Sequence, residues 1–72
     1  MADMSTIGGR IRHYRDITEM SQEAAAQAAG VSVTAWRQWE YGKTEPKARN
    51  IAPIARALGI TPLELLDWEN QE

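Results

Sequence analysis

The sequence predicts an all-α protein of five short helices in a single domain spanning residues 1–72. Apolar residues recur at spacings of three and four, whereas the alternation typical of strands is nearly absent. N-cap residues precede several of these segments, and glycine follows them. The chain has no cysteine, so its small core depends on helix packing and, we expect, on a partner subunit. Residues 1–5 and 69–72 are expected to fray.

The first helix is predicted to begin after Thr6, whose hydroxyl can cap it. Gly8 and Gly9 weaken its first turn by about 1 kcal/mol each relative to alanine. We expect Gly9 to permit close contact with another helix. The apolar face of this helix carries Ile7, Ile11 and Tyr14.

Two helices follow, and each begins at a serine. Ser21 caps a helix that contains AAAQAA and stops at Gly30. Ser32 caps the next, which runs to about Tyr41 and is ended by Gly42. The pattern therefore predicts two short helices joined by a tight turn.

A fourth helix is predicted at about 48–58, with Gly59 as its stop. Pro53 disturbs this segment, because an interior proline removes one helical hydrogen bond. We expect either a start near Asn50, with Pro53 in the first turn, or a bend at Pro53, and we favour a late or distorted start. The apolar face carries Ile51, Ile54, Ala55 and Leu58.

The fifth helix has the clearest start signal in the chain. Thr61 is the expected N-cap, Pro62 occupies the first helical position and Glu64 completes a capping box. This helix should run to about Trp68. Its leucines and Trp68 exceed what one short inner face needs, so Leu63 and Trp68 either close the core or form a dimer interface.

Composition limits the function classes. No apolar run reaches the ~20 residues of a membrane span, so we expect an intracellular, cytoplasmic protein without membrane contact. No ligand set for a metal and no nucleophile–base pair is apparent, and capping explains Ser21 without catalysis. We therefore expect no enzyme activity, no cofactor and no small-molecule ligand.

The net charge of −2 argues mildly against a nucleic-acid partner, but the charge is unevenly distributed. Seven of the eight Lys and Arg residues and six of the ten Asp and Glu residues lie in residues 1–50. The C-terminal segment holds four acidic residues against Arg56 alone. An acidic end can therefore mask a locally basic face.

The segment Ser21 to Lys43 predicts a helix-turn-helix, in which the second helix enters the major groove of double-stranded DNA. Arg37 can pair with guanine and Gln38 with adenine. Thr34 can bond a base or a phosphate, and Val33 can touch a thymine methyl group. These four side chains are expected on the face opposite Trp36 and Trp39, which we assign to the core. The predicted phosphate contacts are Gln22, Ser32 and Lys43.

Residues 7–66 resemble the Cro/phage-repressor-type helix-turn-helix family, also called the xenobiotic-response-element family. The matching segments are IGGRIRHYR, MSQEAAAQAAGVS, WRQWEYGKTEP and IAPIARALGITPLELL. The resemblance implies a five-helix lambda-repressor-like DNA-binding domain. It also implies a bacterial or phage transcriptional regulator, by default a repressor that binds a palindromic operator as a homodimer.

Position by position, the resemblance places base contacts at the same four residues of the third helix and phosphate contacts at Gln22 and Lys43. It further implies a structural ion pair between Arg15 and Glu40. The sequence departs from the family pattern at Ala25, usually leucine, and at Trp36, usually isoleucine. We expect these two changes to compensate each other in volume.

Three alternatives stay open on the sequence alone. Within the class of DNA-binding proteins, the chain is a restriction–modification controller or an antitoxin-like autoregulator. Outside it, the chain is a protein-interaction module that kept the fold without DNA binding. The net acidity and Val33 favour that module, whereas Gln22, Thr34 and Arg37 oppose it.

Overall fold

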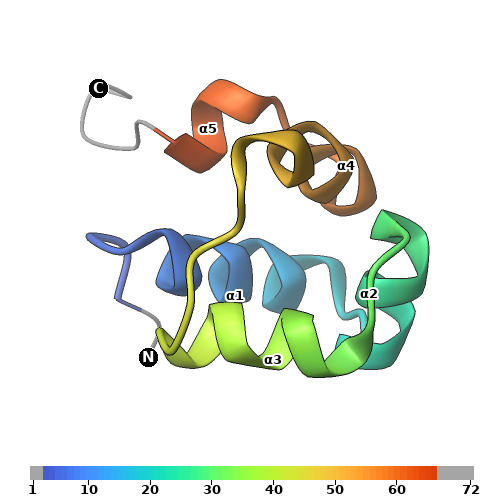
Figure 1. Cartoon of the computed structure of the whole chain (residues 1–72). Coiled ribbons are helices and arrows are strands. Elements are labelled where there is room, and N and C mark those ends of the chain that lie inside the picture. The colour runs from blue at the N-terminus through green and yellow to red at the C-terminus, as the bar shows by residue number, and fades with distance from the viewer. Residues whose placement is uncertain (1–2, 67–72) are drawn as a thin grey trace.

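The computed structural model describes residues 3–66, which form five α-helices and no strand (Figure 1). This confirms the all-α, five-helix prediction. No helix within these residues is long and apolar enough to cross a membrane. The helices are α1 (Ile7–Thr18), α2 (Gln22–Ala29), α3 (Val33–Tyr41), α4 (Ala48–Leu58) and α5 (Pro62–Leu66).

The predicted starts of α1, α2, α3 and α5 are confirmed by their capping hydrogen bonds. The side-chain oxygens of Thr6, Ser21 and Ser32 each accept a hydrogen bond from the backbone N–H three residues later. At α5, Thr61 Oγ1 accepts from Glu64 N at 3.2 Å, and Glu64 Oε1 accepts from Thr61 N at 2.9 Å. Both halves of the capping box are therefore present, and these helix starts follow from local chemistry.

Of the late or distorted start that we favoured for α4, the late start is wrong. The helix begins at Ala48, so Pro53 lies in its interior rather than in its first turn. Asn50 N donates to Lys47 O at 2.8 Å, which closes a tight first turn before the proline. The physical reason for the long helix is its apolar face, which is buried from Ile51 to Leu58. That burial offsets the hydrogen bond that Pro53 cannot make.

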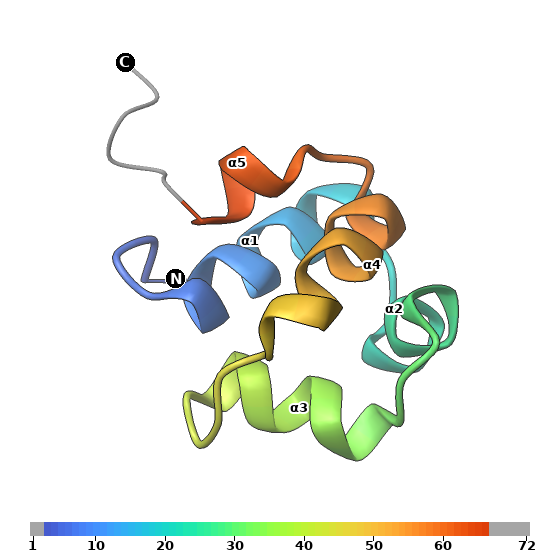
Figure 2. The same ribbon diagram turned by 45° about the horizontal axis from the view of Figure 1, so that its top comes forward.

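The helices form two groups that enclose the core. α1 and α3 lie side by side and run in opposite directions, and α2 closes one end of this pair (Figures 1 and 2). α4 packs on α1 and α2, and α5 packs on α1 and α4. This arrangement leaves the outer side of α3 uncovered within residues 3–66 (Figure 1).

The core confirms the assignment of both α3 tryptophans to the inward face. Trp36 is fully buried and Trp39 is 5% exposed, and their ring centroids are 6.0 Å apart. Ala25 belongs to the same buried cluster as Trp36. A large side chain on α3 thus accompanies a small one on α2, in line with the expected compensation of volume.

Gly8 and Gly9 of α1 each make room for a different part of the chain, and Gly8, not Gly9, faces another helix. A Cβ at Gly8 would overlap the carbonyl oxygen of Trp39, so Gly8 is the residue that lets α1 approach α3. A Cβ at Gly9 would overlap the carbonyl oxygen of Asp3 instead. The expectation that Gly9 permits contact with another helix is therefore wrong, because Gly9 makes room for the N-terminal turn at Asp3.

That turn ties the beginning of the described chain to α1. Thr6 N donates to Asp3 O at 3.2 Å, and Ser5 N donates to Asp3 Oδ1 at 3.0 Å. Residues 3–5 belong to the segment 1–5 that is expected to fray, and these hydrogen bonds connect Asp3 to Ser5 and to the helix cap Thr6. The predicted fraying of residues 69–72 and the end of the fifth helix at Trp68 lie outside the described residues.

Candidate nucleic-acid interface

α2 and α3 form a helix-turn-helix. Gly30 ends α2 with φ +75°, in the left-handed region that favours glycine, and Ser32 caps α3 two residues later. Val31 N donates to Ala26 O at 3.0 Å and closes the turn. Local chemistry therefore closes the turn between the two helices, and Ser32 and Thr34 at the start of α3 are exposed to solvent.

The four predicted base-contacting residues share the outer face of α3 but differ in exposure. Thr34 is exposed, whereas Arg37 and Gln38 are partly buried. Val33 is also partly buried and packs against the core. The face thus offers one apolar position at its start and polar side chains along the following turn, a pattern that suits the major groove.

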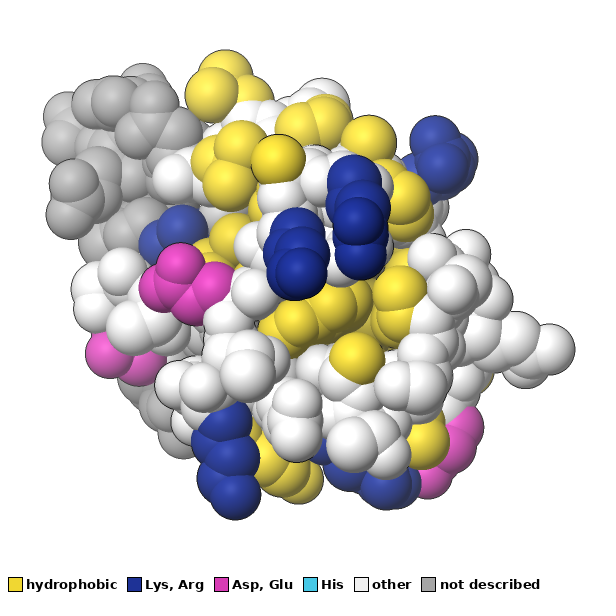
Figure 3. Space-filling view, in the orientation of Figure 1, with side chains coloured by type: hydrophobic (Ala, Val, Ile, Leu, Met, Phe, Trp, Pro, Cys, Tyr) yellow, Lys and Arg dark blue, Asp and Glu magenta, His cyan; other side chains and the backbone are white. Residues whose placement is uncertain are grey.

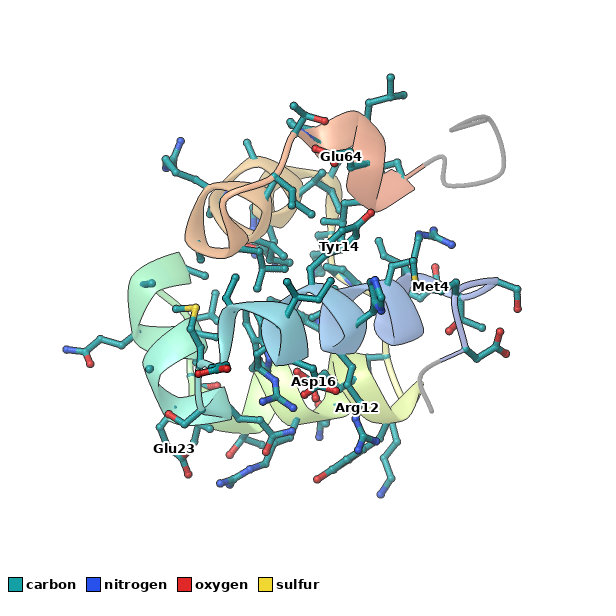
Figure 4. All side chains as sticks on the ribbon, turned by 180° about the vertical axis from the view of Figure 1, so that it is seen from behind. Met4, Arg12, Tyr14, Asp16, Glu23 and Glu64 are labelled. Atoms are coloured by element: carbon teal, nitrogen blue, oxygen red, sulfur yellow. The ribbon has the colours of Figure 1, made fainter. Side chains whose placement is uncertain are left out.

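Arg37 is held by α2. Its Nε donates to Gln22 Oε1 at 3.1 Å, and its Nη2 donates to Glu23 Oε2 at 2.7 Å. The Arg37 side chain is 41% exposed and that of Glu23 is 64% exposed. Figure 4 shows Glu23 at the edge of the molecule, pointing outward from α2. Arg37, the residue predicted to pair with guanine, therefore already uses its Nε and one N–H of its Nη2 within the protein.

Gln22 links this exposed pair to a buried one. Its Nε2 donates to Glu40 Oε1 at 3.0 Å while its Oε1 accepts from Arg37. One of its two N–H donors therefore remains unused by these contacts, and the predicted phosphate contact of Gln22 stays a prediction. The amide cannot rotate without breaking a contact to either Arg37 or Glu40.

Glu40 is the centre of the buried network. Arg15 donates to both carboxylate oxygens, from Nε to Oε2 at 2.5 Å and from Nη2 to Oε1 at 3.0 Å. Trp36 Nε1 donates to Oε2 at 2.6 Å, and Gln22 supplies the fourth donor. Each oxygen thus accepts two hydrogen bonds, and the Glu40 side chain is 1% exposed. The ion pair that the resemblance implied is present and joins α1 to α3.

Electrostatics within this network favour the charged pair. Burial by itself raises the pKa of Glu40, but hydrogen bonds from Arg15, Gln22 and Trp36 outweigh it. The pKa of Glu40 therefore lies below its ordinary value. The hydrogen bond to Glu40 likewise raises the pKa of Arg15. Both groups stay ionised where the protein is folded at neutral pH.

The predicted phosphate contacts are near the ends of the helix-turn-helix. Ser32 Oγ accepts from Ala35 N at 3.1 Å, and Lys43 is exposed just after α3. Within residues 3–66 no ion pair involves Lys43, Lys47 or Arg49. Figure 3 shows basic side chains over α4 and along the lower edge of the molecule, below α3. A locally basic face therefore exists despite the negative net charge.

Two residues with structural consequences escaped the sequence analysis. Glu23 was assigned no role from the sequence, yet its Oε2 accepts a hydrogen bond from Arg37 Nη2. Arg10 is a charged residue of the kind that is usually exposed, yet it is only 7% exposed. Its Nε donates to Leu65 O at 2.5 Å and its Nη1 to Met4 O at 2.9 Å. The available signal was its position three residues after Ile7, on the apolar face of α1.

The predicted dimer residues are only partly described. Leu63 is 65% exposed, and Leu66 beside it is 52% exposed, whereas Leu65 is fully buried. Trp68 lies outside the described residues. α5 therefore buries one leucine in the core and leaves two on its outer surface.

Comparison with known proteins agrees with this geometry. The profile of a family described as helix-turn-helix domain matches residues 6–68. The transcriptional regulator DicA of Escherichia coli K12 is 34% identical over 61 residues, which are 85% of this chain and 45% of DicA. Repressor protein C2 of Salmonella phage P22 is 38% identical over 60 residues, 83% of this chain and 28% of the repressor. The chain thus spans less than half the length of these curated relatives.

Solved structures extend the similarity to three dimensions. The P22 c2 repressor bound to a synthetic operator superimposes with a TM-score of 0.80 at 37% identity, covering 86% of this chain and 94% of that one. The restriction–modification controller C.AhdI of Aeromonas hydrophila superimposes with a TM-score of 0.81 at 33% identity, covering 89% and 97%. The lambda-repressor-like fold that the resemblance implied is therefore confirmed.

Proposed function

The chain belongs to the helix-turn-helix domain family, and from this membership we propose that it regulates transcription by binding double-stranded DNA of a specific sequence. In this proposal it is a repressor that acts in the bacterial cytoplasm. Occupying an operator blocks a promoter by binding alone, and the relatives include two proteins named as repressor or transcriptional regulator.

The observation that carries the proposal is the outer face of α3. Thr34, Arg37 and Gln38 lie on this face with Val33, beside the open N-terminus of the helix. Such a helix fits the major groove and presents donors, acceptors and an apolar group to base edges. Gln22, Ser32 and Lys43 flank it, where they would contact phosphates.

We further propose that the protein binds as a homodimer to two half-sites about one duplex turn apart, ~34 Å. The exposed Leu63 and Leu66 on α5 support this proposal, because two apolar side chains on one short helix suit a symmetric contact. A palindromic operator would follow from that symmetry.

A restriction–modification controller is the second candidate. The specific support is C.AhdI, because the similarity covers 97% of that chain. The two candidates bind DNA in the same way and differ in the genes that they regulate. The operator sequence, located in a genome, separates them.

The test is selection of bound sequences from a pool of random duplexes, followed by affinity measurement at two salt concentrations. We expect a palindrome and an affinity that falls steeply as salt rises. Arg37→Glu should lower operator affinity about a hundredfold or more, because it replaces a donor by a repelled charge. Arg56→Glu makes the same change of charge on α4, outside the helix-turn-helix, and should have a small effect. A folded protein that enriches no sequence would instead favour the protein-interaction module.

A further inference from the structure

Arg37 of α3 is held by two residues of α2, and membership of the family does not assign a role to this contact. We propose that Glu23 is a positioning residue that orients Arg37 toward a guanine and thereby sets the base preference at one position of each half-site. This inference rests on the DNA-binding function proposed above. Gln22 assists, because it occupies the neighbouring donor of the same guanidinium.

The geometry uses one edge of the guanidinium and leaves another. Nε donates to Gln22 Oε1 and Nη2 donates to Glu23 Oε2, at 3.1 and 2.7 Å. Arginine has five N–H donors in one plane, so three remain, two on Nη1 and one on Nη2. Nη1 has no hydrogen-bond partner within residues 3–66. The free edge therefore presents two parallel donors.

Two parallel donors match one base edge in particular. Guanine presents the acceptors N7 and O6 side by side in the major groove, and arginine binds them with two hydrogen bonds. An arginine that is already fixed at its other edge loses less conformational freedom when this contact forms. Pre-orientation by α2 therefore favours guanine over bases that offer a single acceptor.

The charge of Glu23 acts in the same direction. Its carboxylate lies 2.7 Å from the guanidinium and offsets the attraction of Arg37 for a DNA phosphate. A base edge carries no net charge, so the carboxylate repels it much less than it repels a phosphate. The pair thus directs Arg37 to bases, while Lys43 remains free for the backbone.

The frame that holds Arg37 is anchored in the core. Gln22 is fixed by Glu40, which is buried and accepts four hydrogen bonds. Glu23 lies in the first turn of α2, where the helix dipole favours an acidic side chain. The exposed Glu23–Arg37 pair adds little to folding stability, since such surface pairs rarely do. Its consequence is therefore the orientation of one arginine.

The experiment first compares three proteins, which are the wild type, Glu23→Gln and the control Asp16→Asn. It then repeats the change at Glu23 in an Arg37→Lys background. Asp16 lies on α1, outside the helix-turn-helix, where it pairs with the exposed Arg12 at 3.8 Å and also lies 3.7 Å from Arg15 (Figure 4). Each variant loses one negative charge. Operators selected by the wild type are titrated alongside copies in which each guanine is replaced in turn. Circular dichroism checks that every variant is folded.

We expect the wild type to prefer guanine at one position of each half-site. Glu23→Gln should reduce that preference about tenfold, within the range that a bidentate contact contributes. Asp16→Asn should keep it. In an Arg37→Lys background the change at Glu23 should no longer affect this position, because lysine has no second parallel donor.

Other results overturn the inference. An unchanged guanine preference in Glu23→Gln, or a stronger one, would mean that the charged carboxylate of Glu23 does not orient Arg37 for the base. Glu23→Gln should have no effect on this position when Arg37 is replaced by lysine. An effect that persists in that background would also contradict the inference. These failures differ from failure of the proposed function, in which the wild type itself selects no sequence.

Discussion

Two arginine–glutamate pairs each have one member on α3, at positions 37 and 40, and the two pairs differ sharply in burial. Glu40 pairs with Arg15 of α1 inside the molecule, where the two side chains are 1% and 14% exposed. Arg37 pairs with Glu23 of α2 at the surface, where the side chains are 41% and 64% exposed. Gln22 contacts both pairs through its two amide atoms.

The comparison shows how burial changes the role of an arginine–glutamate ion pair. Inside, the carboxylate needs every acceptor position filled, and it has four donors from three helices. A buried group left without its partner is costly, so this pair fixes how the helices pack. At the surface, water can replace either partner, so the pair orients a side chain without holding the fold.

The strongest test of this comparison is Glu40→Gln. The variant keeps the size of the side chain but leaves the Arg15 charge buried without its counter-ion. We expect the free energy of unfolding to fall by about 3–5 kcal/mol. Urea unfolding at neutral pH measures it. A loss below about 1 kcal/mol would show that the buried pair behaves like the exposed one.

A second, smaller loss is expected for Trp36→Phe. Phenylalanine keeps an aromatic ring in the core but removes the indole N–H that donates to Glu40 Oε2. A hydrogen bond to a charged group contributes about 1.5–3 kcal/mol, and we expect a loss of that order. Trp39→Phe is the matched control, because no hydrogen bond from its indole to Glu40 is present. Equal losses in the two variants would argue against a special role of the indole N–H.

The pH dependence of stability offers a third test. Because the folded-state pKa of Glu40 is lowered, the unfolded chain takes up the proton first as the pH falls. The contribution of the charged carboxylate is therefore fully present above the ordinary glutamate pKa of ~4.3 and is lost as the pH falls through the lower folded-state value. We expect the stability difference between wild type and Glu40→Gln to shrink over this range. A difference that is constant with pH would contradict the assigned cause.

The smallest expected effect is that of Glu23→Gln on stability. The exposed pair should contribute less than about 0.5 kcal/mol, and salt should reduce even that. Unfolding curves at low and high salt measure it. A loss comparable to that of Glu40→Gln would mean that the surface pair holds α2 against α3.

Much of the fold follows from local sequence signals. Thr6, Ser21, Ser32 and Thr61 cap helices at the predicted positions, because the capping hydrogen bond spans only three residues. The pattern of α3 likewise predicted which tryptophans face inward. The predicted base and phosphate contacts also come from spacing and resemblance, and they stay predictions until DNA is bound.

The remaining features depend on contacts between distant residues. Arg10 is buried because it binds the carbonyl oxygen of Leu65, 55 positions away, and the spacing of α1 says nothing about that partner. The start of α4 at Ala48 depends on an apolar face that the other helices cover.

The sequence by itself determined the starts of α1, α2, α3 and α5, their caps and the outer face of α3, since these rest on neighbours within one or two turns. Tertiary structure alone decided that Gln22 and Glu23 of α2 meet Arg37 of α3. Helix packing also gave Glu40 four donors. The physical reason is that hydrogen bonds between helices depend on the angle and approach of those helices, which Gly8 and the core set together.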